Sequence, residues 1–344
     1  MLRSRATAVL YHYPCPDGAF AALAAYLYFS SLPPTTAAAT PPPLFFPNTV
    51  YAPIRPGDLP ISQIDCVYLL DFVGPPGFLR HLSSLVRRVI VLDHHKTALE
   101  MLGAETYAGG EVFKVIDMDR SGATIAYDYF LEKLLTATTR DSHNGAADDG
   151  SLDRGIREFR RLRRLFEYIE DRDLWRWKLP DSKAFNNGFD DLKIEFNARS
   201  NPSLFDQLRS LDLDSLISQG KMTISRKQKL IDDSLERSFI IALGGGTYGH
   251  CLAVNADALF ELRSVLGNQL AIKSREMKLR GIGAVIYKVH DLKNDEVVKI
   301  SLRSVDSEDT TPISQKYGGG GHQNASSFML NYADFEKWKV LDST

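Results

Sequence analysis

The chain is poor in the residues that build cross-linked folds. Its 344 residues include only three cysteines, Cys15, Cys66 and Cys251, which lie far apart and form no CxxC pair. This spacing excludes a disulfide framework and a zinc ribbon, and it indicates a reducing, cytoplasmic compartment. The sequence also lacks the run of about 18 apolar residues that a transmembrane helix needs, so we expect no membrane span.

An excess of charge of either sign is also absent. Lys and Arg together number 41 and Asp and Glu number 43, which gives a formal net charge of -2. This balance excludes a protein that holds long nucleic acids by bulk positive charge, and it excludes an acidic disordered tail. The hydrophobic share of 44% is typical of a globular protein, and the length suggests two domains.

Strand-like and helix-like segments alternate through the first two-thirds of the chain. Short apolar runs rich in strand formers alternate with longer segments in which apolar residues recur at helical spacing. This alternation predicts an α/β fold with a parallel sheet and helices on its faces. The strand candidates are 6–13, 66–72, 89–95 and 111–118, and the helix candidates are 18–31, 77–88 and 121–135.

Changes in composition divide the chain further. Residues 32–48 are rich in Pro, Thr and Ala and predict an irregular surface loop. Residues 136–153 are polar and rich in Gly and Asp, which predicts a mobile insertion in a first domain of residues 1–211. A helical stretch at 212–236 predicts a linker helix. From 237 to 344 the strand candidates indicate a second, smaller α+β domain.

Potential metal ligands follow three of the predicted strands. Ligands of parallel sheets bind outside the carboxyl ends of the strands, so these side chains predict one site. Carboxylates and imidazoles together suit Mn²⁺ or Mg²⁺. Taken singly, Asp17 and Asp71 could instead cap helices, and His12 could be an ordinary packed or exposed histidine. The candidates are His12 and Asp17 after the first strand, Asp71 after the second, and Asp93, His94 and His95 after the third.

Two glycine-rich motifs occur in the second domain. GGGGHQNASS at 318–327 places His322 directly after four glycines, which predicts an anion-binding loop with unshielded N–H groups, although a flexible turn is the simpler alternative. Gly244, Gly246 and Gly249 spell GxGxxG. The dinucleotide fingerprint needs a helix after this motif, whereas the apolar run HCLAVNA follows here, so we predict a hairpin turn.

Asp93-His94-His95 after an apolar strand, together with GGGGHQNASS about 225 residues later, resembles the DHH phosphoesterase superfamily. The resemblance is to the branch with a DHH-associated C-terminal domain, which includes single-strand exonucleases, nanoRNA phosphatases and cyclic-dinucleotide phosphodiesterases. It implies an N-terminal parallel-sheet catalytic domain, a smaller substrate-binding C-terminal domain, and an active site in the cleft between them.

The resemblance also implies roles for individual residues. Asp71 would bridge two metal ions, Asp93 would orient the site and His95 would contact phosphate. The family's fourth motif falls on Asp171 or Asp173, of which we favour Asp171 because it directly follows the predicted helix. The metal ligands would be His12, Asp17, Asp71, His94 and Asp171 or Asp173, and the phosphate-binding residues would be His95, Arg303, Gly319, Gly320, Gly321 and His322.

Cys15 departs from the family's pattern. The first motif usually has Asp-x-Asp-Gly, whereas this chain has Cys15-Pro16-Asp17-Gly18, one residue closer than usual to His12. Thiolate is a poor ligand for Mg²⁺ and Mn²⁺. The first metal position is therefore expected to be weak, altered or empty, and one or two ions per chain remain open.

The function implied by the resemblance is metal-dependent hydrolysis of phosphoester bonds in a small nucleotide or short single-stranded oligonucleotide. The near-neutral charge favours a small substrate. The run REFRRLRR (157–164) could be a nucleic-acid track or the solvated face of a helix, and Trp175 and Trp177 could stack bases or pack in the core. A non-catalytic nucleotide or RNA sensor and a pyrophosphatase-like enzyme are the alternatives, and a homodimer is left open.

Overall fold

The computed structural model describes residues 5–33, 41–104, 109–144, 150–289 and 296–340. The chain divides into two compact units, Met1–Thr223 and Ile224–Thr344, each with its own sheet. The division falls inside a long helix, α9 (Leu213–Glu236), which covers the stretch predicted as a linker helix. None of the helices in the described ranges combines the length and apolar character needed to cross a bilayer.

The first unit is built on a five-stranded sheet in the order β2-β1-β3-β4-β5, in which every neighbouring pair is parallel. The central strands are apolar on both faces, as is usual for a parallel sheet buried between helices. This confirms the predicted α/β class. The strands are β1 (Ala6–Tyr13), β2 (Leu44–Thr49), β3 (Ile64–Leu70), β4 (Arg88–Asp93) and β5 (Glu111–Ile116).

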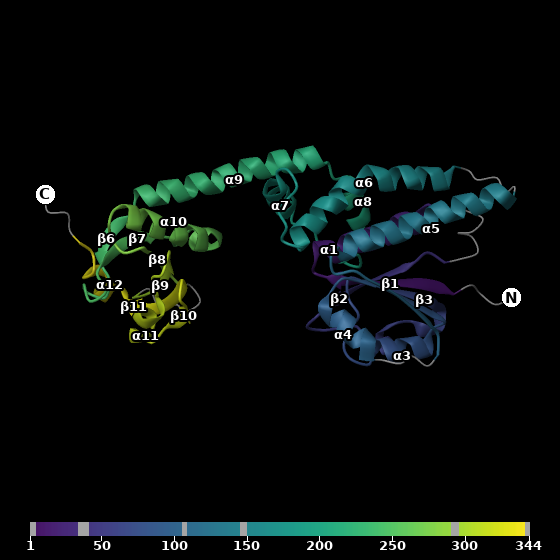
Figure 1. Ribbon diagram of the computed structural model, residues 1–344, viewed down its shortest axis with the longest axis horizontal. Coiled ribbons are helices and arrows are strands. Elements are labelled where there is room, and N and C mark those ends of the chain that lie inside the picture. The colour runs from purple at the N-terminus through teal and green to yellow at the C-terminus, as the bar shows by residue number, and fades with distance from the viewer. Residues whose placement is uncertain (1–4, 34–40, 105–108, 145–149, 290–295, 341–344) are drawn as a thin grey trace. The chain divides into compact units, whose positions relative to one another are not determined.

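Helices cover both faces of this sheet (Figure 1). Alternate strand residues such as Val9 and Leu70 pack with α1, α5 and α6 in one core, whereas Leu10 and Leu69 pack with α3 and α4 in the other. The small residues of α1 let it lie close to its neighbours, and ten of its fifteen residues are buried. The helices are α1 (Pro16–Ser30), α3 (Phe78–Leu85), α4 (Lys96–Ala104), α5 (Gly122–Asn144), α6 (Ser151–Asp173), α7 (Ser182–Asp191) and α8 (Leu204–Arg209). Two short 3-10 turns, η1 (Pro56–Asp58) and η2 (Ile61–Gln63), precede β3.

The prediction of irregular structure was partly wrong for both stretches, 32–48 and 136–153. Residues 44–48 belong to β2, an edge strand, where Pro47 is tolerated because one side of the strand needs no ladder hydrogen bonds. In the stretch 136–153, α5 continues to Asn144 and α6 begins at Ser151, while residues 145–149 lie outside the described part. The hydroxyl of Thr138 donates to the Leu134 carbonyl 3.0 Å away, and Leu152 is fully buried.

The second unit has a six-stranded mixed sheet in the order β10-β11-β9-β8-β7-β6. β7 and β8 are parallel and the other neighbours are antiparallel, which confirms the predicted α+β character. Helix α10 (Arg263–Glu276) packs on one face, and the core of the other face includes residues of α11 (Thr311–Lys316) and α12 (Tyr332–Glu336). The strands are β6 (Phe239–Ala242), β7 (His250–Asn255), β8 (Ile282–Lys288), β9 (Val297–Ser304), β10 (Gly320–His322) and β11 (Ala325–Asn331), and a 3-10 turn, η3 (Phe260–Leu262), precedes α10.

Candidate metal centre

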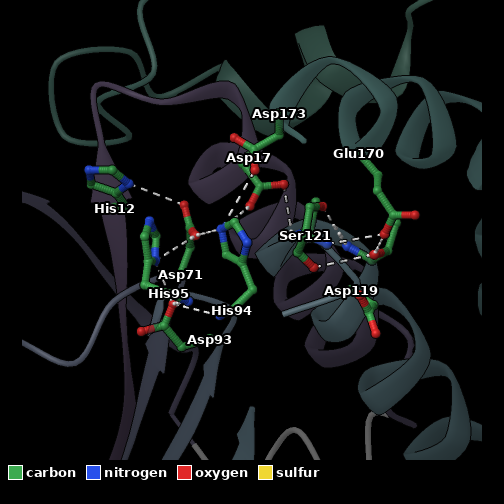
Figure 2. Close-up of polar contacts among 12 residues, drawn as sticks. His12, Asp17, Asp71, Asp93, His94, His95, Asp119, Ser121, Glu170 and Asp173 are labelled. Carbon is green, nitrogen blue, oxygen red and sulfur yellow. Dashed lines mark hydrogen bonds and ion pairs between the residues drawn. The ribbon is translucent and has the colours of Figure 1, made fainter. Parts of the chain in front are cut away.

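The carboxyl ends of three adjacent strands bring the predicted ligands together. β1, β3 and β4 are neighbours in the parallel sheet, so their carboxyl ends meet at one edge. His12 lies near the end of β1, Asp71 follows β3, and Asp93 closes β4. The loops and helices after these strands add Asp17, His94 and His95, as Figure 2 shows. The sheet therefore assembles six of the predicted residues into one cluster.

Asp71 lies at the middle of this cluster. Its carboxylate is almost completely buried, with Oδ2 3.2 Å from His12 Nδ1 and Oδ1 3.2 Å from His94 Nε2. Burial raises the pKa of Asp71, but the contacts with His12 and His94 outweigh burial and lower that pKa to about 2. Its backbone has φ 65°, a left-handed conformation that costs about 1–3 kcal/mol in a residue other than glycine. Such a cost is characteristic of residues held in place for function.

Asp17 is the second buried carboxylate. It lies in the first turn of α1 and accepts a hydrogen bond at Oδ1 from Ala123 N, 3.1 Å away in α5. The N-cap residue of α1 is Cys15, and Asp17 is the second residue of the helix, so the helix-cap alternative is wrong for Asp17. Among the described residues Oδ2 has no hydrogen-bond partner. Burial, followed by the nearby Asp71 and Asp173, raises the pKa of Asp17 well above its usual range. A cation at this place would stabilise the ionised carboxylate.

Asp93 holds the following two histidines in position. Its Oδ1 accepts hydrogen bonds from His94 N and lies 2.7 Å from His95 Nδ1. That contact raises the pKa of His95 to about 9, so the imidazole is cationic near neutral pH. The His95 side chain is 44% exposed, whereas that of His94 is only 11% exposed. His94 therefore faces the carboxylates, and His95 presents a positive charge to solvent.

The structure corrects the choice between Asp171 and Asp173. Helix α6 continues to Asp173, three residues beyond the predicted end at residue 170. Asp173 Oδ2 lies 3.6 Å from His94 Nε2. Asp171 is buried elsewhere, where its carboxylate accepts hydrogen bonds from the backbone N–H groups of Lys178 and Leu179. Asp173 therefore belongs to the cluster, and Asp171 stabilises the turn after the helix.

Three overlapping sets of side chains have the spacing of metal ligands. In each set the ligand atoms lie within 4.8 Å of one another. An ion with ligand distances of about 2.0–2.5 Å fits between atoms at this separation. Buried carboxylate oxygens without hydrogen bonds, on Asp17, Asp71 and Asp93, support a cation at this place. The sets are His12, Cys15 and Asp71; Asp71, His94 and His95; and Asp17, His94 and Asp173.

Cys15 belongs to the first of these sets, although its thiol was expected to weaken or empty this position. Burial, followed by the nearby Asp71 and Asp17, raises the pKa of Cys15 well above the usual range of a thiol. Without a cation, the thiol is therefore protonated near neutral pH.

A cavity of about 310 Å³ opens beside the cluster. Its volume lies at the lower end of the range for sites that bind small molecules. Polar cluster residues form part of the wall, and apolar side chains form much of the rest. The cavity is lined by His12, Asp71, Asp93 and His95, by the apolar residues Val50, Pro53, Phe72, Val73, Pro75, Ala98 and Met101, and by Asn48, Gly74 and Thr97.

Sequence reasoning missed the residues that support Asp17 from α5 and α6. Glu170 accepts hydrogen bonds from Ser121 N and from the Thr124 hydroxyl, so it fixes the first turn of α5 (Figure 2). Gly122 lies in that turn, against the carboxylates of Asp17 and Asp71. The Ser-Gly pair that opens the helix was visible in the sequence, but nothing there showed that it faces Asp17.

Gly122→Ala should lower the affinity for Mn²⁺ by about 10- to 100-fold, the range found when groups that support metal ligands are changed. A Cβ at this place would lie 2.7 Å from Asp71 Cβ and 2.9 Å from Asp17 Oδ2, so both carboxylates would have to shift. Titration calorimetry on the metal-free protein measures the effect. Gly57→Ala is the matched control, because a Cβ there has no neighbour within 4 Å. Equal affinities in the two variants would show that the close approach at Gly122 is unimportant.

In the second unit, Arg303 and His322 lie in one row across the sheet. His322 of β10 pairs with Ala325 of β11, which pairs with Arg303 of β9, so the three side chains share a face. At the usual strand spacing the two basic residues are about 10 Å apart. His322 is exposed, and the Arg303 guanidinium donates to Ser264 Oγ at 2.8 Å. The residue between them, Ala325, has a small side chain.

The prediction that the glycines at 318–321 form a loop with free N–H groups was partly wrong. Gly319 N donates to the Ser314 carbonyl and Gly318 N to that of Gln315, so these N–H groups are not free. Gly320 and Gly321 belong to β10, and side chains at Gly319 or Gly321 would collide with β11. These two glycines therefore let the strands approach closely. Only at Gly318 and Gly320 in this run would a Cβ meet open space.

No family model matches the chain. The sequence is 25% identical over 330 residues to the uncharacterized protein R106 of Acanthamoeba polyphaga mimivirus, an alignment that covers 94% of this chain and 67% of the viral protein. Among solved structures, the chain is similar to an exopolyphosphatase-related protein from Bacteroides fragilis, with a TM-score of 0.29, 15% identity and coverage of 96% and 87% of the two chains. It is also similar to PggH, a pGpG-specific phosphodiesterase from Vibrio cholerae, with a TM-score of 0.38, 11% identity and coverage of 97% and 96%. At these TM-scores, the functional argument rests on the geometry of the cluster.

Proposed function

We propose that this chain is a metal-dependent phosphoesterase that hydrolyses phosphoester bonds of a small nucleotide or short oligonucleotide. One observation carries the proposal: Asp17, Asp71, His94 and Asp173 converge at the carboxyl edge of the first sheet, with buried carboxylate oxygens that lack hydrogen bonds. Packing does not require four such groups at one place. Perturbed carboxyl pKa values beside a cavity are typical of catalytic sites.

The ligand set fits Mn²⁺ or Mg²⁺, because carboxylate oxygens predominate and imidazole favours Mn²⁺. When bound, such an ion would assist phosphoester hydrolysis in two ways: it would polarise the phosphoryl oxygens, and it would lower the pKa of water. Asp17, Asp71, His94 and Asp173 would hold it. Asp93 fixes the ring of His95, which would then donate a hydrogen bond to the phosphate as charge develops on it.

Two features of the first unit favour a small nucleotide over a long polynucleotide. The cavity beside His95 has the volume of a site for a small molecule. In the Arg-rich stretch of α6, Arg161, Arg163 and Arg164 already form ion pairs with acidic neighbours, as expected for the solvated face of a helix. These arginines are therefore poor candidates for a track along a nucleic-acid backbone.

Trp175 supports a ligand that contains a base. It lies two residues after Asp173 and is 78% exposed, with φ 52°. The centroid of its ring lies 5.5 Å from that of Trp177, and the two rings meet edge to face. Because Trp175 is exposed, it does not pack in the core. A base that stacks on such a ring gains about 1–3 kcal/mol.

We propose that Arg303 and His322 bind a phosphate group of the substrate. Arg303→Ala and His322→Ala should each raise KM by about 10-fold or more, because a hydrogen bond to a charged group contributes about 1.5–3 kcal/mol. Metal content should match that of the parent, since neither residue belongs to a ligand set among the described residues. Steady-state kinetics and elemental analysis measure both effects. Arg275→Ala is the control, because this exposed arginine forms an ion pair with Asp306 on the surface. An unchanged KM in both variants would contradict the assignment.

The function is tested by incubating the full chain with Mn²⁺ or Mg²⁺ and a panel of linear dinucleotides, cyclic dinucleotides, adenosine bisphosphate and pyrophosphate. Metal-dependent hydrolysis of a nucleotide supports the proposal. Hydrolysis of pyrophosphate alone would instead indicate a pyrophosphatase-like enzyme. Nucleotide binding without turnover under any metal would indicate a non-catalytic sensor.

A further inference from the structure

Cys15 lies at the junction between β1 and α1, where the chain turns beside the metal cluster. It is the residue before the first turn of α1, and its carbonyl accepts the hydrogen bond of Ala19 N. Its Sγ is close enough to ligand atoms of His12 and Asp71 for all three to contact one ion. Within the described part of the chain, neither Cys66 nor Cys251 belongs to such a set. The thiol is therefore placed by the fold where a metal ligand is needed.

The remaining members of this set are already oriented. Asp71 Oδ2 lies 3.2 Å from His12 Nδ1, and the carboxylate is only 1% exposed. Its Oδ1 lies 3.2 Å from His94 Nε2 but does not meet the geometry of a hydrogen bond. Asp71 thus has a buried oxygen without a hydrogen bond, directed into the cluster. It can contribute one oxygen to an ion beside Cys15 and the other to an ion beside His94.

The two ends of the cluster differ in ligand chemistry. One end has two carboxylates and one imidazole, from Asp17, Asp173 and His94. The other end has a sulfur, an imidazole and a carboxylate, from Cys15, His12 and Asp71. Sulfur ligands favour Zn²⁺, Fe²⁺ and Co²⁺ over Mn²⁺ and Mg²⁺, whereas carboxylates favour the latter pair. Three protein ligands also leave a position free for substrate or water, as in catalytic zinc sites.

We propose that His12, Cys15 and Asp71 form a metal position that selects a thiophilic divalent ion such as Zn²⁺, Fe²⁺ or Co²⁺, so that the centre holds two different metals. The inference rests on the metal centre of the proposed function, but it does not depend on which reaction the centre performs. It replaces the expectation that Cys15 leaves this position weak or empty.

Cobalt substitution tests the assignment. Addition of Co²⁺ to the metal-free 344-residue chain should produce a near-ultraviolet thiolate-to-metal charge-transfer band. Cys15→Ser should abolish the band. Cys66→Ser and Cys251→Ser should keep it, because these thiols lie outside the ligand sets. Absence of the band in the parent, or its survival in Cys15→Ser, would overturn the proposal.

Metal competition provides a second measurement. Cys15→Asp should lower the preference for Zn²⁺ over Mn²⁺ at this position by about 10-fold or more, because a hard oxygen replaces sulfur. An unchanged preference contradicts the proposal. If the variants fail to fold, alkylation of the parent replaces them: Zn²⁺ should slow alkylation of Cys15 and Mg²⁺ should not, as read by peptide mass spectrometry. Equal protection by both ions contradicts thiol selectivity.

The outcomes also separate this inference from the proposed function. A charge-transfer band without hydrolysis of any phosphoester leaves the thiolate site standing and removes the enzyme assignment. Hydrolysis by a protein that gives no charge-transfer band supports the enzyme assignment and removes the thiolate site.

Discussion

Asp71→Asn should lower phosphoesterase turnover by about 10³-fold and should reduce the metal content of the purified protein. Among the described residues, Asp71 belongs both to the set that contains Cys15 and to the set that contains His94 and His95, so its loss affects both sets. A bound ion supplies several kcal/mol of transition-state stabilisation, and each 1.36 kcal/mol corresponds to a factor of ten in rate. Turnover with saturating Mn²⁺ and elemental analysis after dialysis measure the two effects.

The matched control lies on β3, the strand that Asp71 follows. Asp65 is at the opposite end of β3, where it forms a partly exposed ion pair with Arg87. Asp65→Asn should leave turnover and metal content unchanged, since such surface pairs contribute about 0–1 kcal/mol to stability. If Asp71→Asn keeps its ions and its turnover, the cluster is not the active site.

The position of the site was predictable because it depends on a simple property of parallel sheets. Apolar strands that end in Asp or His place these side chains at the same edge whenever the strands are neighbours. β1, β3 and β4 are such neighbours, so His12, Asp71 and Asp93 meet. The hairpin at Gly244–Gly249 was predictable for a similar reason, since the apolar run after it forms β7, antiparallel to β6.

Other features depended on contacts between distant segments and were not predictable. β2 forms at 44–49 although Pro47 disfavours a strand, because the neighbouring β1 supplies an edge for pairing. Leu152 is fully buried in the first turn of α6, whereas its polar surroundings in the sequence suggested an insertion. The role of Gly122 follows only from its distance to Asp17 and Asp71, which are remote in sequence.

The choice between Asp171 and Asp173 could not be predicted from the sequence either. Both follow an apolar helical face, and the sequence pattern placed the end of the helix before them. The structure extends α6 by three residues, from 170 to Asp173, and Asp173 then lies toward His94 whereas Asp171 accepts hydrogen bonds from the following turn. Two residues of helix rotate a side chain by more than half a turn, so a small error in the helix end reassigns the ligand.

The two carboxylates should therefore respond in opposite ways to the same substitution. Asp173→Asn should lower metal affinity and turnover by about 100-fold with little change in the melting temperature of the metal-free protein, because a partly exposed ligand is lost. Asp171→Asn should keep metal affinity within a few-fold. It should lower the melting temperature by about 4–10 °C, since a buried carboxylate that accepts backbone hydrogen bonds contributes about 1.5–3 kcal/mol.

Calorimetric metal titration and thermal denaturation of both metal-free variants provide the comparison, and each variant serves as the control for the other. Loss of metal affinity in Asp171→Asn with an unchanged melting temperature would restore Asp171 as the ligand. Loss of stability in Asp173→Asn with intact metal binding would make Asp173 a structural residue. The crossed result can arise only if the end of α6 directs one carboxylate to the cluster and the other to the backbone of residues 178–179.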